Sequence, residues 1–261
     1  MTAEQWLKLH QKYERYAYPK FREGLRLSYQ PLLDNVNMIS YENYKDVIPM
    51  LVKRQPLIAA YATVYSKVGL MHGKIVGKEL NQLQDRKRYV RDIYESEFLS
   101  AIYEWVQTHL GRRIVDVNDY TIELIQQLVE NALDRSYTVS QMTSYLERQL
   151  NSPKFNRMRA LRIARTETTT AANHGAFKAA ESSDLVMDKE WISISDNRTR
   201  HSHLAENGQT AEQYGKFTMS DGTLMLYPGD QSAPAKQVVN CRCTYAFIPR
   251  RDEDGLLIFK N

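Results

Sequence analysis

The sequence predicts an α+β fold: a long helical N-terminal region, then a small C-terminal domain with one long helix packed on a small, mainly antiparallel sheet. Two observations predict it. Apolar residues recur at helical spacing through most of residues 1–183. After residue 184, strand-like alternation and turn residues replace that pattern. A chain of 261 residues with 43% hydrophobic content can form one large domain or two modest ones.

The first predicted helix covers residues 3–16 and ends at Pro19. Its apolar stripe consists of Trp6, Leu9, Tyr13 and Tyr16. A second helix begins after Pro56 and includes Ile58, Tyr61, Tyr65 and Val68. Glycines follow at four-residue intervals, at Gly69, Gly73 and Gly77. This stripe of small residues favours the close approach of another helix.

Four further helices follow in the pattern. The first runs from about Gln82 to His109 and ends at Gly111, with Tyr94, Phe98, Ile102 and Trp105 at helical spacing. Asn118 is the expected N-cap of the next, whose buried face comprises Ile122, Ile125, Val129 and Leu133. A short helix spans about 140–150, and a long one follows Pro153 to about residue 183.

Tyrosine is concentrated in the N-terminal half of the chain. Of the 17 tyrosines, 11 precede residue 106. A tyrosine side chain offers a large contact area with a polar tip, which suits half-exposed helix faces and interfaces. The distribution is equally consistent with a tyrosine-rich edge of the core and with a docking surface.

The C-terminal third contains the predicted strands. Residues 185–195 alternate and are rich in β-forming residues. Residues 215–219 and 223–228 are expected to pair as a hairpin around Ser220–Gly222. Residues 236–249 are the expected final strand, after a loop at 228–235.

Both cysteines lie in the segment Val239–Cys243. In a strand, Cys241 and Cys243 would point to one face, and His201 and His203 would do the same if extended. Together they could supply four ligands to a tetrahedral zinc ion, although both spacings are tighter than in common zinc modules. The alternative is a pair of small buried side chains. A disulfide is the least favoured role, because we expect a reducing cytoplasm and a strained ring.

The segment after the first predicted strand is rich in charge. Asp196, Arg198, Arg200 and His203 could form an acid–base or phosphodiester site, or an ion-paired network that holds an irregular loop. The second interpretation is favoured. The sequence contains no nucleophile elbow, phosphate-cradling glycine loop or HExxH helix, so we predict no catalytic residues.

The net charge of +4, from 35 Lys+Arg and 31 Asp+Glu, is too small to indicate a polyanionic partner by itself. A local basic face is expected from Lys154, Arg157, Arg162 and Arg165, which share an arc of about 140° on a helical wheel. Met158 and Leu161 lie inside the same arc. The face is therefore a candidate for phosphate contacts, with arginine stems covering apolar surface as the alternative.

An ordered series of motifs resembles a known family. The segments are ARTETTTAANHGA (164–176), Trp191, DNRTRHSH (196–203), Gly208, PGD (228–230) and NCRC (240–243). Their order is similar to that of the phage Mu protein F-like (MuF) domain of minor head, or head-morphogenesis, proteins of tailed bacteriophages, over roughly residues 110–248. The family pattern falls on Arg165, Thr166, Glu167, Trp191, Asp196, Arg198, Arg200, His203, Gly208, Asn240, Cys241 and Cys243.

The resemblance implies a role and a location. Family members are components of the head, associated with the portal or packaged inside, and some accompany the DNA. The implied partners are portal, scaffold or capsid proteins and phage DNA, and no catalytic activity is implied. Because relatives commonly have another residue at His201, the better metal ligands are His203, Cys241 and Cys243, with Asp196 or water as the fourth.

We therefore expect residues 1–112 to form a helical portal- or assembly-docking region. Residues 113–261 would form the MuF-like region, with helices in 118–183, an α+β part at 184–250 and a tail at 251–261. The N-terminus lacks a secretory signal pattern and no apolar run reaches the roughly 18 residues of a membrane span, so we expect a virion protein made in the host cytoplasm. The alternative is a metal-dependent hydrolase or nuclease using Asp196, His203, Cys241 and Cys243.

Overall fold

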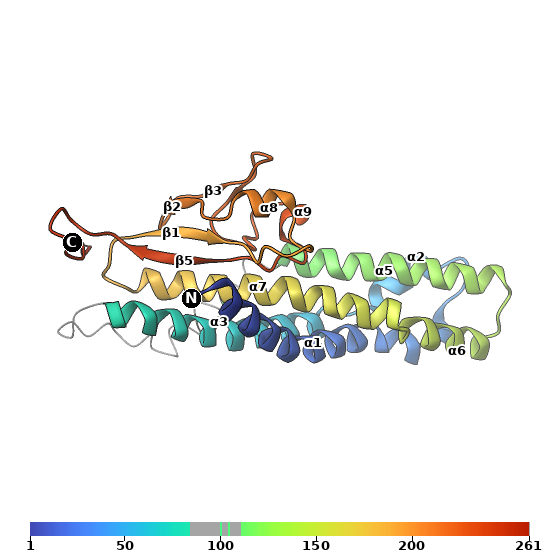
Figure 1. Cartoon of the computed structure of the whole chain (residues 1–261). Coiled ribbons are helices and arrows are strands. Elements are labelled where there is room, and N and C mark those ends of the chain that lie inside the picture. Colours follow the sequence, from blue (N-terminus) through green and yellow to red (C-terminus); the bar gives the residue numbers. More distant parts are fainter. Residues whose placement is uncertain (84–99, 101–103, 105–110, 261) are drawn as a thin grey trace. The chain divides into compact units, whose positions relative to one another are not determined.

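The structure is a computed structural model that describes residues 1–83, 100, 104 and 111–260 (Figure 1). It confirms the predicted α+β class, with long helices and a small antiparallel sheet in the C-terminal part. The chain forms two compact units that alternate along the sequence. Unit 1 comprises residues 1–17, 64–105 and 163–261, and unit 2 comprises 18–63 and 106–162. The predicted boundary between residues 112 and 113 stays a prediction.

Helix α1 (Ala3–Asp34) contributes its first part to unit 1 and the rest to unit 2. The prediction that Pro19 ends this helix is wrong, because Pro19 lies inside it. A proline in a helix interior removes one backbone hydrogen bond and costs about 3 kcal/mol. That cost is offset here because the buried stripe continues on both sides of Pro19. Trp6, His10, Tyr13 and Ala17 are buried before it, and Phe21, Leu25 and Tyr29 after it.

The described regular elements of unit 2 are all helices, joined by short turns. Besides the later part of α1 and the first part of α3, its elements are η1 (Val36–Met38), α2 (Tyr44–Leu51), α5 (Gly111–Asp134), α6 (Val139–Leu150), the π-helical turn η2 (Pro153–Arg157) and the start of α7. Ile125 and Val129 of α5 lie in its core, as predicted, and Ile122 and Leu133 pack partly buried against it. Thr138 caps α6 through a reciprocal pair of hydrogen bonds with Gln141.

Two predicted helix boundaries are wrong. Gly111, predicted as a stop after a helix, is itself helical as the first described residue of α5 (Gly111–Asp134), and Asn118 is a buried residue inside α5 instead of its N-cap. The local capping preference of asparagine is outweighed by the apolar face, which continues toward the N-terminus through the buried Ile114. The predicted stripe of Tyr94, Phe98, Ile102 and Trp105 lies outside the described residues.

In unit 1, α3 (Gln55–Leu83) and α7 (Met158–Glu181) approach each other closely. A Cβ atom added to Gly175 of α7 would lie 2.2 Å from the carbonyl oxygen of Gly69 in α3. No side chain fits at that distance, so the contact requires glycine. The predicted close approach at the glycine stripe is thereby confirmed at Gly69.

The sheet of unit 1 has three antiparallel strands in the order β2 (Thr210–Glu212), β1 (Met187–Ile192) and β5 (Thr244–Pro249). Figure 1 shows this sheet lying along α7. Trp191 pairs with Tyr245 across the central strand. The predicted hairpin is confirmed as β3 (Phe217–Thr218) and β4 (Leu224–Met225).

Lys189 of β1 is fully buried on the core side of the sheet. Its ammonium group donates to the carbonyl oxygens of Gln213 (3.0 Å) and Leu226 (2.6 Å) and lies over the rings of Phe177 and Phe217. Burial lowers the pKa of Lys189 to about 8. These contacts satisfy the ammonium group inside the core, so Lys189 is a structural residue of the sheet.

The tyrosines divide between core and surface. Tyr13, Tyr29, Tyr44, Tyr61 and Tyr65 are buried, which confirms the core interpretation for these five. Tyr41 is 60% exposed. Among the described helices, none combines the length and apolar character that crossing a membrane would require.

Replacing Gly175 with alanine tests the close approach of α3 and α7. We expect Gly175→Ala to lower the free energy of unfolding by roughly 1–3 kcal/mol, because the methyl group overpacks against the Gly69 backbone. Chemical denaturation of the full chain measures this change. Gly111→Ala is the matched control, because open space surrounds its added Cβ. Equal effects of the two substitutions would contradict the proposed steric cause.

Candidate functional site

The cysteine segment follows a short helix, α9 (Ala235–Val238), and precedes β5. The prediction that Cys241 and Cys243 lie in a strand is wrong, because β5 begins only at Thr244. Asn240 has a left-handed backbone (φ 57°), which asparagine tolerates better than most residues. This conformation turns the chain immediately before Cys241 and excludes an extended strand there.

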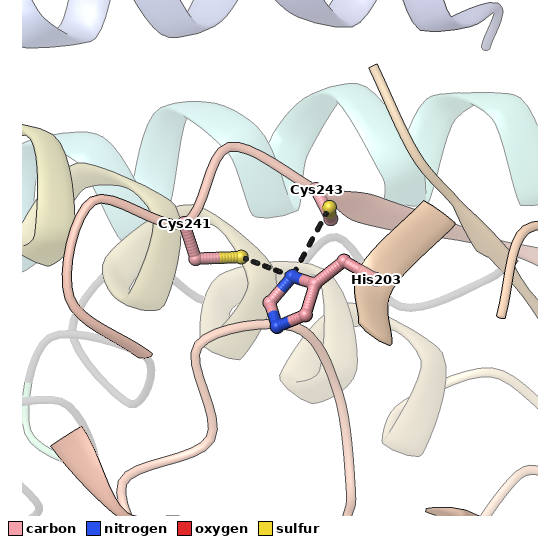
Figure 2. Close-up of side chains that lie close together, drawn as sticks. All are labelled: His203, Cys241 and Cys243. Atoms are coloured by element: carbon pink, nitrogen blue, oxygen red, sulfur yellow. Dashed lines mark hydrogen bonds between the residues drawn. The ribbon is translucent and has the colours of Figure 1, made fainter. Parts of the chain in front are cut away.

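The two thiols nevertheless meet one histidine. The Sγ atoms of Cys241 and Cys243 lie 3.6 and 3.5 Å from Nδ1 of His203, which belongs to α8 (His201–Ala205) (Figure 2). All three side chains are at most 2% exposed. Both cysteines are free thiols. The structure therefore brings together three of the five predicted metal ligands.

The thiols influence each other's protonation. A hydrogen bond between them raises the pKa of Cys241 and lowers the pKa of Cys243, and burial adds to the increase at Cys241. Cys243 is consequently the thiol that deprotonates first.

The far side of the His203 ring is held by α9. Its Nε2 atom lies 2.8 Å from Oε1 of Gln237, which also accepts a hydrogen bond from Ser202. The amide nitrogen of Gln237 donates to Asp221 Oδ2 at 2.8 Å. Because this amide nitrogen is oriented toward a carboxylate, the amide oxygen faces His203 and can only accept. The proton of the imidazole therefore resides on Nε2, and the lone pair of Nδ1 faces the thiols.

The other two predicted ligands lie elsewhere. His201 is exposed at the start of α8. Asp196 accepts from both terminal nitrogens of Arg242, at 2.6 and 2.8 Å, and from the backbone N–H of Arg198. The Arg242 guanidinium, followed by these smaller contacts, holds the pKa of Asp196 far below its usual range. Asp196 thus joins its loop to the cysteine segment as an ion pair.

Two further motif residues, Arg200 and Gly208, also have structural partners. Arg200 donates to the carbonyl oxygen of Val239. Gly208 has a φ of 83°, and its N–H donates to the carbonyl oxygen of Trp191, whose ring lies in the core. Arg198 is exposed. The favoured interpretation of the charged loop as a network that fixes irregular backbone agrees with these contacts.

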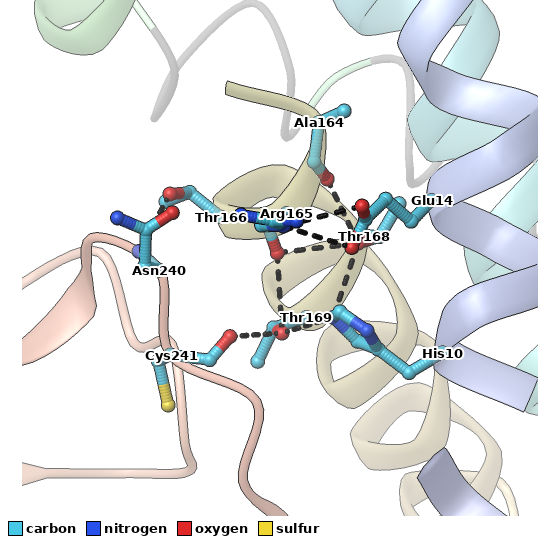
Figure 3. A network of polar contacts seen from close by, with 9 residues as sticks. All are labelled: His10, Glu14, Ala164, Arg165, Thr166, Thr168, Thr169, Asn240 and Cys241. Carbon is cyan, nitrogen blue, oxygen red and sulfur yellow. Dashed lines mark hydrogen bonds and ion pairs between the residues drawn. The ribbon is translucent and has the colours of Figure 1, made fainter. Parts of the chain in front are cut away.

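One face of α7 holds the cysteine segment in place (Figure 3). Thr166 Oγ1 accepts from the backbone N–H of Asn240 at 2.9 Å, and Thr169 Oγ1 donates to the carbonyl oxygen of Cys241 at 2.5 Å. One turn further on, the Asn173 amide donates to the carbonyl oxygen of Cys243 at 3.1 Å. The threonine-rich motif therefore positions the backbone that carries both thiols.

The same helix is tied to α1. Arg165 forms an ion pair with Glu14, and Nε2 of His10 is hydrogen-bonded to Thr169 Oγ1 at 2.9 Å (Figure 3). The buried Glu167 accepts a 2.5 Å hydrogen bond from Tyr65 of α3. Trp6 Nε1 donates to the carbonyl oxygen of Arg242. The motif residues of α7 thus form part of one buried network in unit 1.

The four residues of the predicted basic face divide between the two units. Lys154, Arg157 and Arg162 are exposed in unit 2. Arg165 belongs to unit 1, where Glu14 occupies its guanidinium. A basic face made by all four residues stays a prediction.

Three residues of the site were not predicted from the sequence. Gln237 orients His203, Asn173 holds Cys243, and Arg242 pairs with Asp196. The sequence could have indicated Asn173, because this residue follows Thr169 by four positions and therefore lies on the same face of the helix. Gln237 and Arg242 reach partners distant in sequence, and no spacing rule indicates such contacts.

Together, the fold and the site define a small α+β domain whose cysteine loop is fixed by α7 and closed over a buried histidine. The family model for phage Mu protein F-like proteins matches residues 123–246. The chain therefore contains a phage Mu protein F-like domain over these residues. No curated protein and no solved structure matches the chain.

The buried His10 predicts a pH dependence of stability. Burial, aided by nearby arginines, lowers the pKa of His10 to about 4, against about 6.5 in an unfolded chain. Between these values the unfolded chain binds a proton that the folded chain does not, so the free energy of unfolding falls as the pH falls. We expect a loss of about 2 kcal/mol from His10 between pH 7 and 4.5, measured by chemical denaturation.

His10→Gln should remove this part of the pH dependence. The buried His72, whose pKa is lowered to about 3, accounts for a remaining decline. His201→Gln is the matched control, because it replaces an exposed imidazole of the same unit. An unchanged pH dependence in His10→Gln would contradict the assignment.

Proposed function

We propose that the protein is a minor head protein of a tailed phage or prophage that acts in head morphogenesis, bound to the portal or packaged inside the head. The observation that carries the proposal is the family match over residues 123–246, which contains every motif residue from Arg165 to Cys243. The family is one of head morphogenesis rather than of known enzymes.

The contacts of the motif residues support a structural role. His203, Cys241 and Cys243 are buried, and Asp196 is engaged by Arg242. A hydrolase using these four groups would need substrate access to the thiols and a carboxylate directed at the same centre. The thiols are buried away from substrate, and the Asp196 carboxylate is paired with Arg242. The assembly role is therefore preferred to the metal-dependent hydrolase.

The N-terminal region offers surfaces for docking to portal, scaffold or capsid proteins. In unit 2, three large apolar side chains are exposed within a short stretch around η1 and α2. They are Met38 (52%), Tyr41 (60%) and Met50 (67%). Methionine and tyrosine are enriched in protein interfaces because they combine contact area with adaptability. We assign this stretch to the docking surface.

Incorporation into particles tests the assembly role. We expect mass spectrometry of purified particles and procapsids to find the protein at low copy number. Met38→Ser/Met50→Ser should reduce incorporation at least several-fold, because it removes exposed contact area without disturbing the core. The control Leu256→Ser changes a side chain that is 64% exposed elsewhere in the chain.

Two outcomes would count against this function. Absence of the wild-type protein from both particles and procapsids would oppose a role in the head. Normal incorporation of Met38→Ser/Met50→Ser would leave the head assignment intact and remove the docking surface. Equal melting temperatures of the variants and the wild type are needed to exclude unfolding as the cause.

A contribution to DNA binding is proposed for the exposed basic side chains Lys154 and Arg157. Each phosphate that a protein neutralises adds about 0.9 to the log–log salt dependence of duplex binding. We expect Lys154→Gln/Arg157→Gln to reduce the magnitude of this slope by about 1.8, measured by fluorescence anisotropy. Lys12→Gln/Arg15→Gln on α1 is the control for removal of two exposed charges. Binding that is absent or independent of salt in the wild type would refute the contribution.

A further inference from the structure

The buried cluster of His203, Cys241 and Cys243 has the dimensions of a metal site. In a tetrahedral zinc site, bonds of about 2.3 Å to sulfur and 2.0–2.1 Å to nitrogen separate the nitrogen from each sulfur by about 3.5–3.6 Å. The observed distances from Nδ1 to the two Sγ atoms are 3.6 and 3.5 Å. All three candidate ligand atoms lie within 4.8 Å of one another. We propose that these three residues bind a zinc ion.

The orientation of His203 supports this assignment. The hydrogen bond from Nε2 to Gln237 leaves the Nδ1 lone pair facing the two thiols, as Figure 2 shows for the ring. Histidines that bind metals commonly donate their other ring N–H to such a partner, which fixes both tautomer and ring direction. Gln237 is itself held by Asp221, and Asp221 forms an ion pair with Lys236. The imidazole is thus preorganised for coordination.

The chemistry of the ligands selects the metal class. Two thiolates and a neutral imidazole balance the charge of a divalent cation, so the loaded site carries no net charge into the protein interior. Sulfur and imidazole ligands favour zinc over the hard cations magnesium and calcium, which prefer oxygen. The charge balance and the ligand type therefore indicate the same ion.

The fourth ligand is assigned to water. Among the described residues, the cluster with metal-binding geometry contains only His203, Cys241 and Cys243. Asp196 is held by Arg242, and His201 is exposed at the start of α8. The site consequently has three protein ligands instead of the four that the two sequence pairs suggested.

Zinc at this position would join separate segments of unit 1. His203 belongs to α8, and the cysteines belong to the loop before β5. Through Gln237 and Asp221, the site also connects to α9 and the β3–β4 turn. These segments are short and irregular, so cross-linking them by metal limits local opening. This stabilisation would be independent of any role of the protein in the phage head.

Metal titration of the full-length protein tests the proposal. The chain is purified with reduced thiols, stripped with a chelator and titrated with Co²⁺ and then Zn²⁺. We expect one Co²⁺ per chain, the thiolate-to-cobalt charge-transfer band and the intense visible bands of tetrahedral cobalt. Zn²⁺ should displace cobalt, abolish these bands and raise the melting temperature.

Variants connect the signal to the named residues. Cys241→Ser/Cys243→Ser should abolish the charge-transfer band. Gln237→Ala should weaken zinc binding by about 10- to 100-fold while keeping the tetrahedral spectrum, because it removes a positioning residue and no ligand. His201→Gln should bind cobalt as the wild type does. Circular dichroism verifies folding, and Gln237→Ala remains informative if the serine variant does not fold.

Several results would overturn the proposal. One is a folded wild-type chain with two titratable thiols that takes up neither cobalt nor zinc. A second is a charge-transfer band that persists in the folded serine variant. A third is purification of the chain with Cys241 and Cys243 joined as a disulfide that resists mild reduction.

Discussion

The hydrogen bonding of one face of α7 to the cysteine segment is the constraint on which the rest of the site depends. Thr166, Thr169 and Asn173 follow each other at helical spacing and bind the backbone of Asn240, Cys241 and Cys243. Threonine is short and stiff about χ1, so it fixes the backbone with little freedom. Because the backbone is held from one side, both thiols are directed to the other, where His203 lies. A longer side chain at Thr166 or Thr169 would displace the segment and separate the thiols from the imidazole.

Charged groups in unit 1 reinforce this arrangement by pairing across elements. Arg242 lies between the cysteines in sequence, yet its side chain reaches Asp196, while its carbonyl oxygen accepts from Trp6 of α1. Arg165 pairs with Glu14, also of α1. A buried charge is tolerated only when it is paired and hydrogen-bonded, and an ion pair that loses one partner is strongly destabilising. The fold itself therefore accounts for the charges of Asp196, Arg165 and Arg242 through these pairs.

Periodicity predicted the elements that are governed by burial of one face: α3, α6, α7, β1 and the β3–β4 hairpin. It failed where tertiary packing outweighs a local preference. Pro19 does not end α1 because the buried stripe resumes at Phe21, and Asn118 is not a cap because α5 already buries Ile114. The cysteine segment was predicted as strand from its β-forming residues, but the left-handed Asn240 and the hydrogen bonds from α7 impose a loop. The division of the chain into two alternating units could not be predicted, because no local feature of the sequence marks the boundaries between the units.

The meeting of His203 with both cysteines was predicted from their chemistry and the order of the motifs, although the strand geometry used to argue it was wrong. In a strand, the alternation of side chains would have directed both cysteines to one face. In this structure, the hydrogen bonds from α7 and the turn at Asn240 set the direction of the two thiols instead. The contacts of Gln237 with His203 and Asp221 could not be predicted from the sequence. They depend on how α9 and the β3–β4 hairpin pack. The residue types of a site thus follow from its chemistry and can be anticipated. The groups that orient them follow from tertiary packing, and they decide whether His203 presents a lone pair or a proton to the thiols.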